Sequence, residues 1–274
     1  MKLTDTHCHL DFDRFAADRD QVLGRAQAAG LIRILIPALH ETSGEAAVKL
    51  AQTSPMLYAA VGVHPTEART WSGETPQNLR RLAREPKVVA IGEIGLDYYW
   101  DAAPAALQQE VLRRQLELAA ELNLPVILHL REKGDAAAGP CAEDLLRLVG
   151  DWVGGLRATG HPLAERPGVF HSFSGSLEVA QQALTLGFYI GVSGPVTYRA
   201  ERAAVIAALP LQRLLLETDA PFLSPAPFRG KRNEPAHIRH IADKIAQIFS
   251  CDQEEVAAIT TRNAAHLFAW GGLD

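Results

Sequence analysis

Two histidines near the start of the chain are spaced in a way that suits metal binding. His7 and His9 stand two residues apart in MKLTDTHCHLDF, directly after a run that is typical of a β-strand. Side chains at positions i and i+2 of a strand point the same way, with Cα atoms about 6.6 Å apart. Two imidazoles at that spacing can bind one ion, with Zn–N bonds of about 2.0–2.1 Å. A His-x-His pair also arises by chance among 10 histidines, so this pair requires partners elsewhere in the chain.

Further ionisable side chains fall near the ends of other apolar runs. They are His64 in LYAAVGVH, Glu93 in VVAIGEIG, His129 in PVILHLR, His171 in GVFHSFS, and Glu217 and Asp219 in LLLETDAP. A lone histidine on an apolar strand is usually a core residue with its hydrogen bonds satisfied. A buried carboxylate among Val and Ile is costlier, because it needs a cation or hydrogen bonds.

The elements that would position these residues alternate regularly. Eight short apolar runs are predicted to be strands, at residues 2–7, 31–38, 57–64, 88–95, 125–131, 168–174, 188–194 and 214–221. Helical patterns separate them, such as residues 105–123, with Pro104 before the pattern and Asn123 at its end. Alternating strands and helices predict βαβ units. Eight units in about 250 residues predict a (β/α)8 TIM barrel, an α/β fold, as a single domain over residues 1–274.

Two regions outside this pattern carry expectations of their own. Two further helices are expected after His237. The glycine-rich segment 133–167 is expected to hold one crossover helix and an irregular loop over the barrel mouth.

A barrel would bring the ionisable residues together, because its active sites assemble at the C-terminal ends of the strands. The strongest candidates are four histidines and two carboxylates: His7, His9, His129, His171, Glu93 and Asp219. This set exceeds the needs of one tetrahedral ion and suits two ions about 3.5–4 Å apart that share a bridging carboxylate. Nitrogen and oxygen ligands fit Zn²⁺, Mn²⁺ or Co²⁺, or Mg²⁺ with more waters. Two such ions lower the pKa of bound water and polarise the bond to be cut, so the expected chemistry is hydrolysis. Redox chemistry is disfavoured, since no dinucleotide-binding G-x-G-x-x-G motif opens a helix.

Composition narrows the class of protein. Hydrophobic residues make up 47% and charged residues 22% of the chain, as in ordinary soluble globular proteins. No apolar run reaches the ~18–20 residues of a membrane helix, and the N-terminus does not resemble a signal peptide. Cys8, Cys141 and Cys251 are too scattered for a disulfide framework, which favours a reducing cytoplasm. The net charge of −5 gives no general attraction to nucleic acid, so such contact would need a local patch.

Several motifs together resemble those of the TatD family of metal-dependent deoxyribonucleases, in the amidohydrolase superfamily. They are DTHCHLDF, GVHP, GEIGLDYYWD, QQEVLRRQLELAAELNLPVILHLRE, FHSFSG, LLLETDAPFLSP and RGKRNEP, and they run in order over nearly the whole chain. The resemblance implies a (β/α)8 barrel with two divalent ions and nuclease activity, typically 3′→5′ exonuclease activity.

The resemblance also implies roles for individual residues. The His-x-His pair matches ligands of one metal ion, and His129 and His171 match ligands of the second. Glu93 of GEIGLD matches the bridging carboxylate. Asp219 of ETDAP matches the carboxylate on the first metal, near the nucleophilic water. Glu93 and Asp219 are therefore the expected catalytic carboxylates.

Other residues are expected close to the metal ligands. His64 is expected to meet a substrate phosphate or a metal, or to form a hydrogen bond behind a ligand. Glu217 shares the face of Asp219 unless the strand is bulged. It is therefore expected to be a further metal ligand or to accept a hydrogen bond from a histidine N–H. Asp97 is expected in a loop or behind a ligand. Cys8 is expected to point away from the site into the core.

Two groups are expected at the rim of the site. A basic cluster follows the last strand: Arg229, Lys231, Arg232 and Asn233. It either captures substrate phosphate or forms a solvated loop. An aromatic run follows Glu93: Tyr98, Tyr99 and Trp100. These rings either stack on bases or pack over the barrel mouth.

Two features depart from the family pattern. The stretch Gly150–Pro167 is longer than expected, and Phe228 precedes the RGK motif where a polar residue is expected. Both are expected to border the substrate mouth and to affect substrate preference, while leaving the metal site intact.

The favoured function is a dinuclear phosphodiesterase that acts on single-stranded DNA or 3′ ends, with no membrane and no obligate protein partner. One alternative is another hydrolase of esters, amides or lactones, including D-aminoacyl-tRNA deacylation, because this metal chemistry serves many substrates. A second is a non-catalytic metal-binding scaffold. The ligand set argues against the scaffold, which has no need to keep open positions for water.

Overall fold

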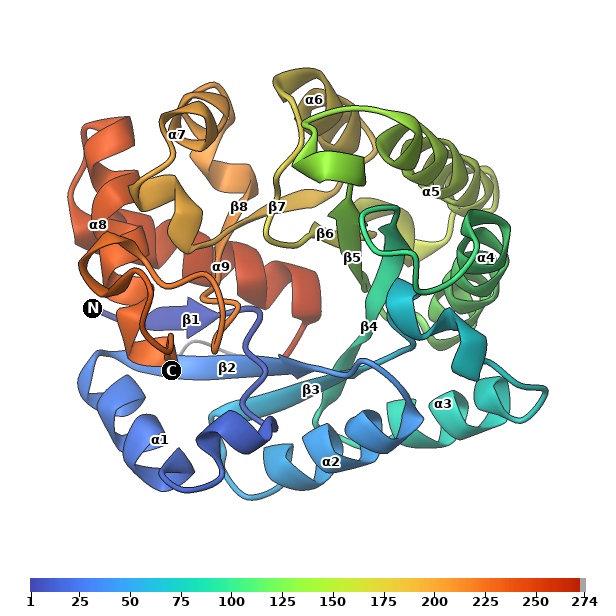
Figure 1. The fold of residues 1–274 in the computed structure, drawn as a ribbon, viewed down its shortest axis with the longest axis horizontal. Helices are drawn as coiled ribbons and strands as arrows, with labels where there is room; N and C mark the ends of the chain where they lie inside the picture. The colour runs from blue at the N-terminus through green and yellow to red at the C-terminus, as the bar shows by residue number, and fades with distance from the viewer. Residues whose placement is uncertain (272–274) are drawn as a thin grey trace.

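A computed structural model describes residues 1–271 as a barrel of eight parallel strands surrounded by helices (Figure 1). The strands are β1 (Leu3–Asp5), β2 (Leu31–Pro37), β3 (Leu57–Val61), β4 (Val88–Asp97), β5 (Val126–Arg131), β6 (Gly168–Phe170), β7 (Tyr189–Val192) and β8 (Leu214–Leu216). They pair in sequence order. Thr6 N donates to Leu216 O (3.1 Å), and Cys8 forms an isolated parallel β-bridge with Ala220. The chain that follows β1 therefore pairs with β8 and the residues after it, which closes the barrel. The predicted (β/α)8 barrel is confirmed.

Helices cover the outside of the barrel (Figure 1). Within residues 1–271 they are α1 (Arg19–Ala28), α2 (Glu41–Ala51), α3 (Thr75–Ala83), α4 (Ala105–Leu122), α5 (Pro140–Ala158), α6 (Leu177–Thr185), α7 (Ala200–Ala207), α8 (Ile238–Phe249) and α9 (Gln253–Phe268). Asn123 ends α4 with φ of 54°, and the Asp252 side chain caps α9. The two helices expected after His237 are α8 and α9. None of the helices described is long and apolar enough to cross a membrane.

Two apolar layers support the barrel. The larger one lies between the strands and the surrounding helices and includes the fully buried Cys8, as expected. The smaller one joins inward-facing strand residues such as Leu35, Ala60 and Leu215 to Phe268 and Trp270 at the end of α9. These apolar side chains fill the N-terminal end of the barrel, which leaves the C-terminal end for polar groups.

Several predicted strands are too long. β1, β6 and β8 end before the ionisable residues, which therefore lie in the turns beyond these strands. The prediction that His7 and His9 share one face of a strand was wrong, since β1 ends at Asp5. Asp219 (φ 53°) and Ser172 (φ 42°) adopt left-handed backbone conformations that are incompatible with a strand.

The segment 133–167 is more regular than predicted. Nineteen of its residues form α5, which contains Gly150, Gly154 and Gly155. The stretch Gly150–Pro167 does not border the mouth, because Val126 N, at the start of β5, donates to Pro167 O (2.9 Å). That end of the barrel is opposite the strand ends that carry the ionisable residues, so the prediction that this stretch shapes the substrate mouth was wrong.

Candidate metal centre

Glu93 lies among imidazoles at the C-terminal end of the barrel. Its side chain comes from β4 and is 3% exposed. Oε1 lies 2.7 Å from both His129 Nδ1 and His171 Nε2. Oε2 lies 3.3 Å from His7 Nε2 and 3.9 Å from His9 Nε2. The two carboxylate oxygens therefore face two different groups of ring nitrogens.

One side of the cluster consists of His7, His9 and Asp219. The two Nε2 atoms are 3.3 Å apart, and Asp219 Oδ1 lies 3.8 Å from His7 Nε2 and 3.6 Å from His9 Nε2. The buried carboxylate of Asp5, which had no predicted role, joins the two segments. It accepts hydrogen bonds from His7 N (3.2 Å), Thr218 N (2.9 Å) and Thr218 Oγ1 (2.6 Å). The only feature of the sequence that could have indicated this role of Asp5 is its position two residues before His7.

On the other side, Asp97 orients the ring of His129. Oδ2 of Asp97 lies 2.9 Å from His129 Nε2, and Oδ1 accepts from Tyr99 N and Trp100 N (3.0 Å each). With its proton on Nε2, His129 presents the lone pair of Nδ1 toward Glu93. A carboxylate behind a histidine in this way is typical of metal sites.

His64 and Glu217 take different places around the cluster. His64 Nε2 lies 3.4 Å from Glu93 Oε1, and its Nδ1 is 2.7 Å from Thr66 Oγ1. Glu217 is fully buried, accepts from Ser172 N and from Thr6 Oγ1, and lies 3.9 Å from His171 Nδ1. Burial raises the pKa of Glu217 well above its usual range, which favours a neutral carboxyl behind His171.

The charges of the cluster suit a cation. Burial raises the pKa of Glu93, but the imidazoles of His171, His64 and His7 outweigh it and hold the pKa well below the usual range. Burial lowers the pKa of His7 to about 4, so this ring is neutral near pH 7 and available as a ligand. Contacts with Asp97 and Glu93 outweigh burial and raise the pKa of His129 to about 9, so binding a metal there displaces a proton.

The atom positions also fit metal binding. Three sets of ligand atoms lie within 4.8 Å of one another: His7, Glu93 and His171; His7, His9 and Asp219; and His64, Glu93 and His129. Nε2 of His7 and Nε2 of His9 face each other at a separation that one divalent ion can bridge. The donor set, imidazole nitrogens and ionised carboxylates, is the one that Zn²⁺, Mn²⁺ and Co²⁺ prefer.

Asn233 does not reach the surface of the site. It is fully buried, and its Nδ2 donates to Thr218 O (2.8 Å) and Phe222 O (2.7 Å). Its Oδ1 accepts from Glu234 N (2.9 Å). The amide holds the loop against the residues on either side of Asp219, so the prediction that Asn233 binds substrate was wrong.

The three cationic side chains of the basic cluster, unlike Asn233, are not buried, and each has different surroundings. Arg232 pairs with Asp18 (2.7 Å), and the guanidinium of Arg229 lies 4.6 Å from the centre of the Tyr198 ring. The side chain of Lys231 is exposed. Arg229 and Lys231 remain candidates for phosphate contact, whereas Arg232 is engaged in holding the loop to the segment before α1.

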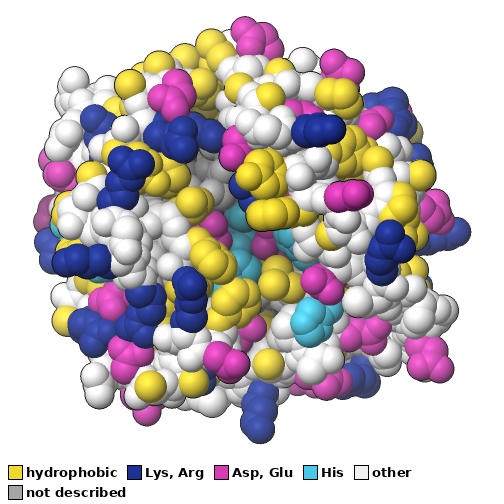
Figure 2. Space-filling view, in the orientation of Figure 1, with side chains coloured by type: hydrophobic (Ala, Val, Ile, Leu, Met, Phe, Trp, Pro, Cys, Tyr) yellow, Lys and Arg dark blue, Asp and Glu magenta, His cyan; other side chains and the backbone are white. Residues whose placement is uncertain are grey.

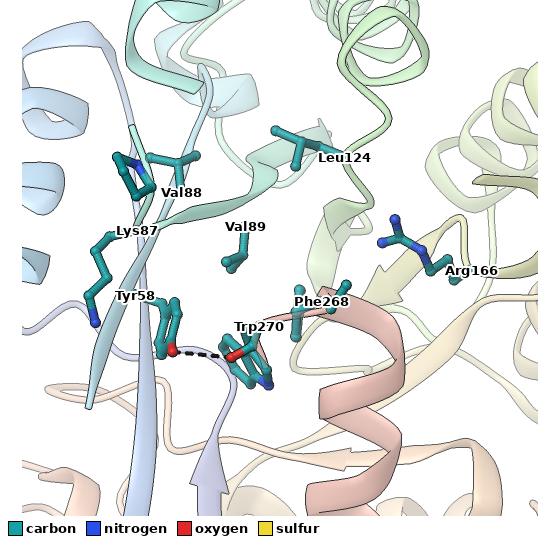
Figure 3. A pocket seen from close by; sticks show the side chains of 10 residues that line it. Tyr58, Lys87, Val88, Val89, Leu124, Arg166, Phe268 and Trp270 are labelled. Atoms are coloured by element: carbon teal, nitrogen blue, oxygen red, sulfur yellow. Dashed lines mark hydrogen bonds between the residues drawn. The ribbon is translucent and has the colours of Figure 1, made fainter. Parts of the chain in front are cut away.

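The mouth of the barrel exposes the cluster to solvent. Figure 2 shows histidine and acidic side chains at the bottom of a hollow, bordered by hydrophobic side chains with Lys and Arg around them. Phe228 stacks on the ring of His237, with centroids 3.9 Å apart. A separate cavity of about 480 Å³ lies at the other end of the barrel, lined by residues that include Tyr58, Lys87 and Trp270 (Figure 3). Among residues 1–271, no histidine or carboxylate lines that cavity.

Comparison with known proteins agrees with this geometry. The model of the TatD related DNase family matches residues 4–269. The chain is 39% identical over 268 residues to the uncharacterized metal-dependent hydrolase YabD of Bacillus subtilis, covering 97% of this chain and 98% of that one. It is 37% identical over 272 residues to the 3′-5′ ssDNA/RNA exonuclease TatD of Erwinia tasmaniensis, covering 96% and 98%. The crystal structure of YjjV, a TatD homolog from Escherichia coli, has a TM-score of 0.87 at 36% identity, covering 97% and 98%. The chain therefore belongs to the TatD related DNase family, a family of metal-dependent hydrolases.

Proposed function

We propose that this protein is a 3′→5′ exonuclease on single-stranded DNA that uses two divalent metal ions. The observation that carries the proposal is the position of Glu93, whose Oε2 faces His7 and His9 while its Oε1 faces His129 and His171. A carboxylate between two sets of nitrogen ligands is the arrangement expected of a bridge between two ions. The relative that acts on single-stranded DNA and RNA supports the choice of polymer.

The residues around the bridge have separate tasks. Bound ions would lower the pKa of water and polarise the phosphodiester. Asp219 lies beside both histidines of the pair and keeps 13% of its side chain exposed, so it can accept a proton from an attacking water. We expect His64, Arg229 and Lys231 to hold substrate phosphates. A site at the bottom of a walled mouth admits a flexible single strand more easily than a rigid duplex.

Metal dependence and polymer choice can be tested together. Protein stripped of metal should not shorten a 5′-labelled single-stranded oligonucleotide, and adding Mn²⁺, Co²⁺, Zn²⁺ or Mg²⁺ should restore a ladder that shortens from the 3′ end. Elemental analysis should find two ions per chain. Full activity in verified metal-free protein, or one ion at saturation, would contradict the dinuclear mechanism.

Variants and competing substrates sharpen the test. Glu93→Gln should lose both activity and metal, whereas Glu234→Gln, which removes a carboxylate paired with Arg25, should keep both. Duplex DNA, RNA, D-aminoacyl-tRNA and a lactone panel should be assayed beside the single strand. If the tRNA ester or a lactone were hydrolysed with the highest kcat/KM, the protein would be a hydrolase of that bond and not a deoxyribonuclease.

A further inference from the structure

The exposed large apolar side chains of the protein are concentrated at the barrel mouth. Within residues 1–271, five large hydrophobic side chains are exposed, and apart from Met1 they come from two short segments: Tyr99, Trp100, Phe222 and Leu223. Water contact with such side chains is unfavourable, so their concentration around one opening indicates a binding surface. Figure 2 shows hydrophobic side chains along the border of the hollow that contains the histidines.

The aromatic rings form two pairs. The β8-side pair is Phe12 and Phe222, with centroids 6.0 Å apart, and 43% of Phe222 is exposed. The β4-side pair is Tyr99 and Trp100, with centroids 4.8 Å apart, and 55% of Trp100 is exposed. Each pair meets edge to face, at 81° and 78° respectively, and the more exposed ring of each pair, Phe222 or Trp100, is the one available to a ligand.

Both pairs are fixed to the metal centre. Phe222 N donates to Asp219 O (2.9 Å), and Phe12 stacks on the ring of His9 with centroids 4.7 Å apart. The backbone nitrogens of Tyr99 and Trp100 both donate to the carboxylate that orients His129. A ligand held on either pair is therefore held at a set distance from the reacting groups.

The pairs lie on opposite sides of the mouth. The strands are ordered β1 to β8 around the barrel, so β4 and β8 are four positions apart in a ring of eight. Each pair also has an arginine beside it: Arg131 lies 3.7 Å from the centre of the Tyr99 ring, and Arg14 lies 5.7 Å from that of Phe222. Aromatic faces next to guanidinium groups are the usual way to bind unpaired bases and their phosphates.

We propose that the two pairs are stacking platforms for the two bases on either side of the scissile phosphate. The inference rests on the proposed nuclease function and deepens it. Bases can reach both platforms only when they are unpaired and splayed apart, so the substrate class is single-stranded nucleic acid of any base sequence. The enzyme should recognise the bases by their ring faces, and a chain of bare sugar-phosphates should bind poorly.

The test compares KM on matched substrates. Phe222→Ala and Trp100→Ala should each raise KM for a single-stranded oligonucleotide by roughly 5–150-fold, the range of one lost base-aromatic stack. Trp100→Phe and Phe222→Tyr should recover most of the loss. An oligonucleotide with abasic sites at its last two positions loses both stacks. It should therefore bind wild-type protein more weakly than either alanine variant binds the intact oligonucleotide, and the alanine variants should weaken it no further. Tyr58→Ala, at the other end of the barrel, is the aromatic control with unchanged KM.

Two results separate this inference from the proposed function. If the wild-type protein cuts oligonucleotides but both alanine variants keep its KM, the platforms are wrong and the nuclease stands. If the wild-type protein cuts no nucleic acid, oligonucleotide binding to metal-free protein is measured by quenching of tryptophan fluorescence, with Trp100→Phe as the reference. Quenching that depends on Trp100 and on the presence of bases would support the platforms without the nuclease, and absence of quenching would overturn both.

Discussion

Asp97→Asn should weaken metal binding, although Asp97 acts through the ring of His129 and is not itself one of the expected metal ligands. In the wild-type protein one carboxylate oxygen accepts from His129 Nε2 (2.9 Å) and the other accepts from Tyr99 N and Trp100 N. An asparagine has only one acceptor oxygen, so it cannot serve both sides. If that oxygen keeps the two backbone N–H groups, the new NH₂ group faces the N–H of His129.

The conflict has a defined outcome. Two facing donors repel, and His129 can relieve the repulsion by moving its proton to Nδ1, the nitrogen that lies 2.7 Å from Glu93. A protonated Nδ1 cannot bind a metal. Loss of such a supporting carboxylate typically lowers metal affinity 10–100-fold, or about 1.4–2.7 kcal/mol. We therefore expect metal affinity to fall within this range and excess metal to recover part of the activity.

The assay is calorimetric titration of metal-free protein with Mn²⁺ or Zn²⁺, together with kcat at saturating metal. Asp135→Asn is the matched control, because Asp135 is an exposed carboxylate that contacts Arg131 beyond the end of β5 and no histidine. It should bind metal as the wild type does. The reasoning about the tautomer would be refuted if Asp97→Asn bound both ions with wild-type affinity.

Three further changes test other parts of the structure. Asp219→Asn should keep its metal content but lose about 10²-fold or more in kcat, on the scale of a lost general base; near wild-type kcat would move that role to another residue. Asn233→Ala should lower the free energy of unfolding in urea by roughly 1–3 kcal/mol, because it leaves buried carbonyls of the loop unpaired; unchanged stability with a raised KM would instead restore the substrate-binding prediction. Hydrogen bonds from Arg232 lower the pKa of Asp18 to about 2, so this carboxylate stabilises the fold above its unfolded pKa of about 3.9 and loses that effect as the pH falls toward 2. Asp18→Asn should therefore lower Tm at pH 7 by an amount that shrinks below pH 4, and an equal difference at both pH values would count against the ion pair.

The fold and the ligand types were predictable from the sequence because both depend on local patterns. Apolar runs alternating with helical patterns define βαβ units, and eight of them define the barrel before any contact is known. In this fold the C-terminal strand ends meet around one axis. Side chains such as Glu93, His129 and Asp219 were therefore expected together although they are far apart along the chain, and the structure places them together.

The positions beyond the strand ends depended on tertiary structure. Strand periodicity stops where the ladder stops, so it could not show that His7 and His9 meet in a turn beyond β1, which ends at Asp5. Asp5 reaches Thr218 across 213 residues of sequence, and only closure of the barrel brings them together.

The same reason explains the error at Asn233 and why the position of Phe222 relative to Trp100 was not foreseen. A polar residue beside a basic cluster resembles a substrate contact in sequence, but its burial depends on how the loop folds back over β8. Phe222 and Trp100 carry no shared motif. They lie on opposite sides of the mouth only because β4 and β8 occupy opposite positions in the ring. Residue types and their order along the chain determine which chemistry is available, and closure of the barrel decides which of those residues meet.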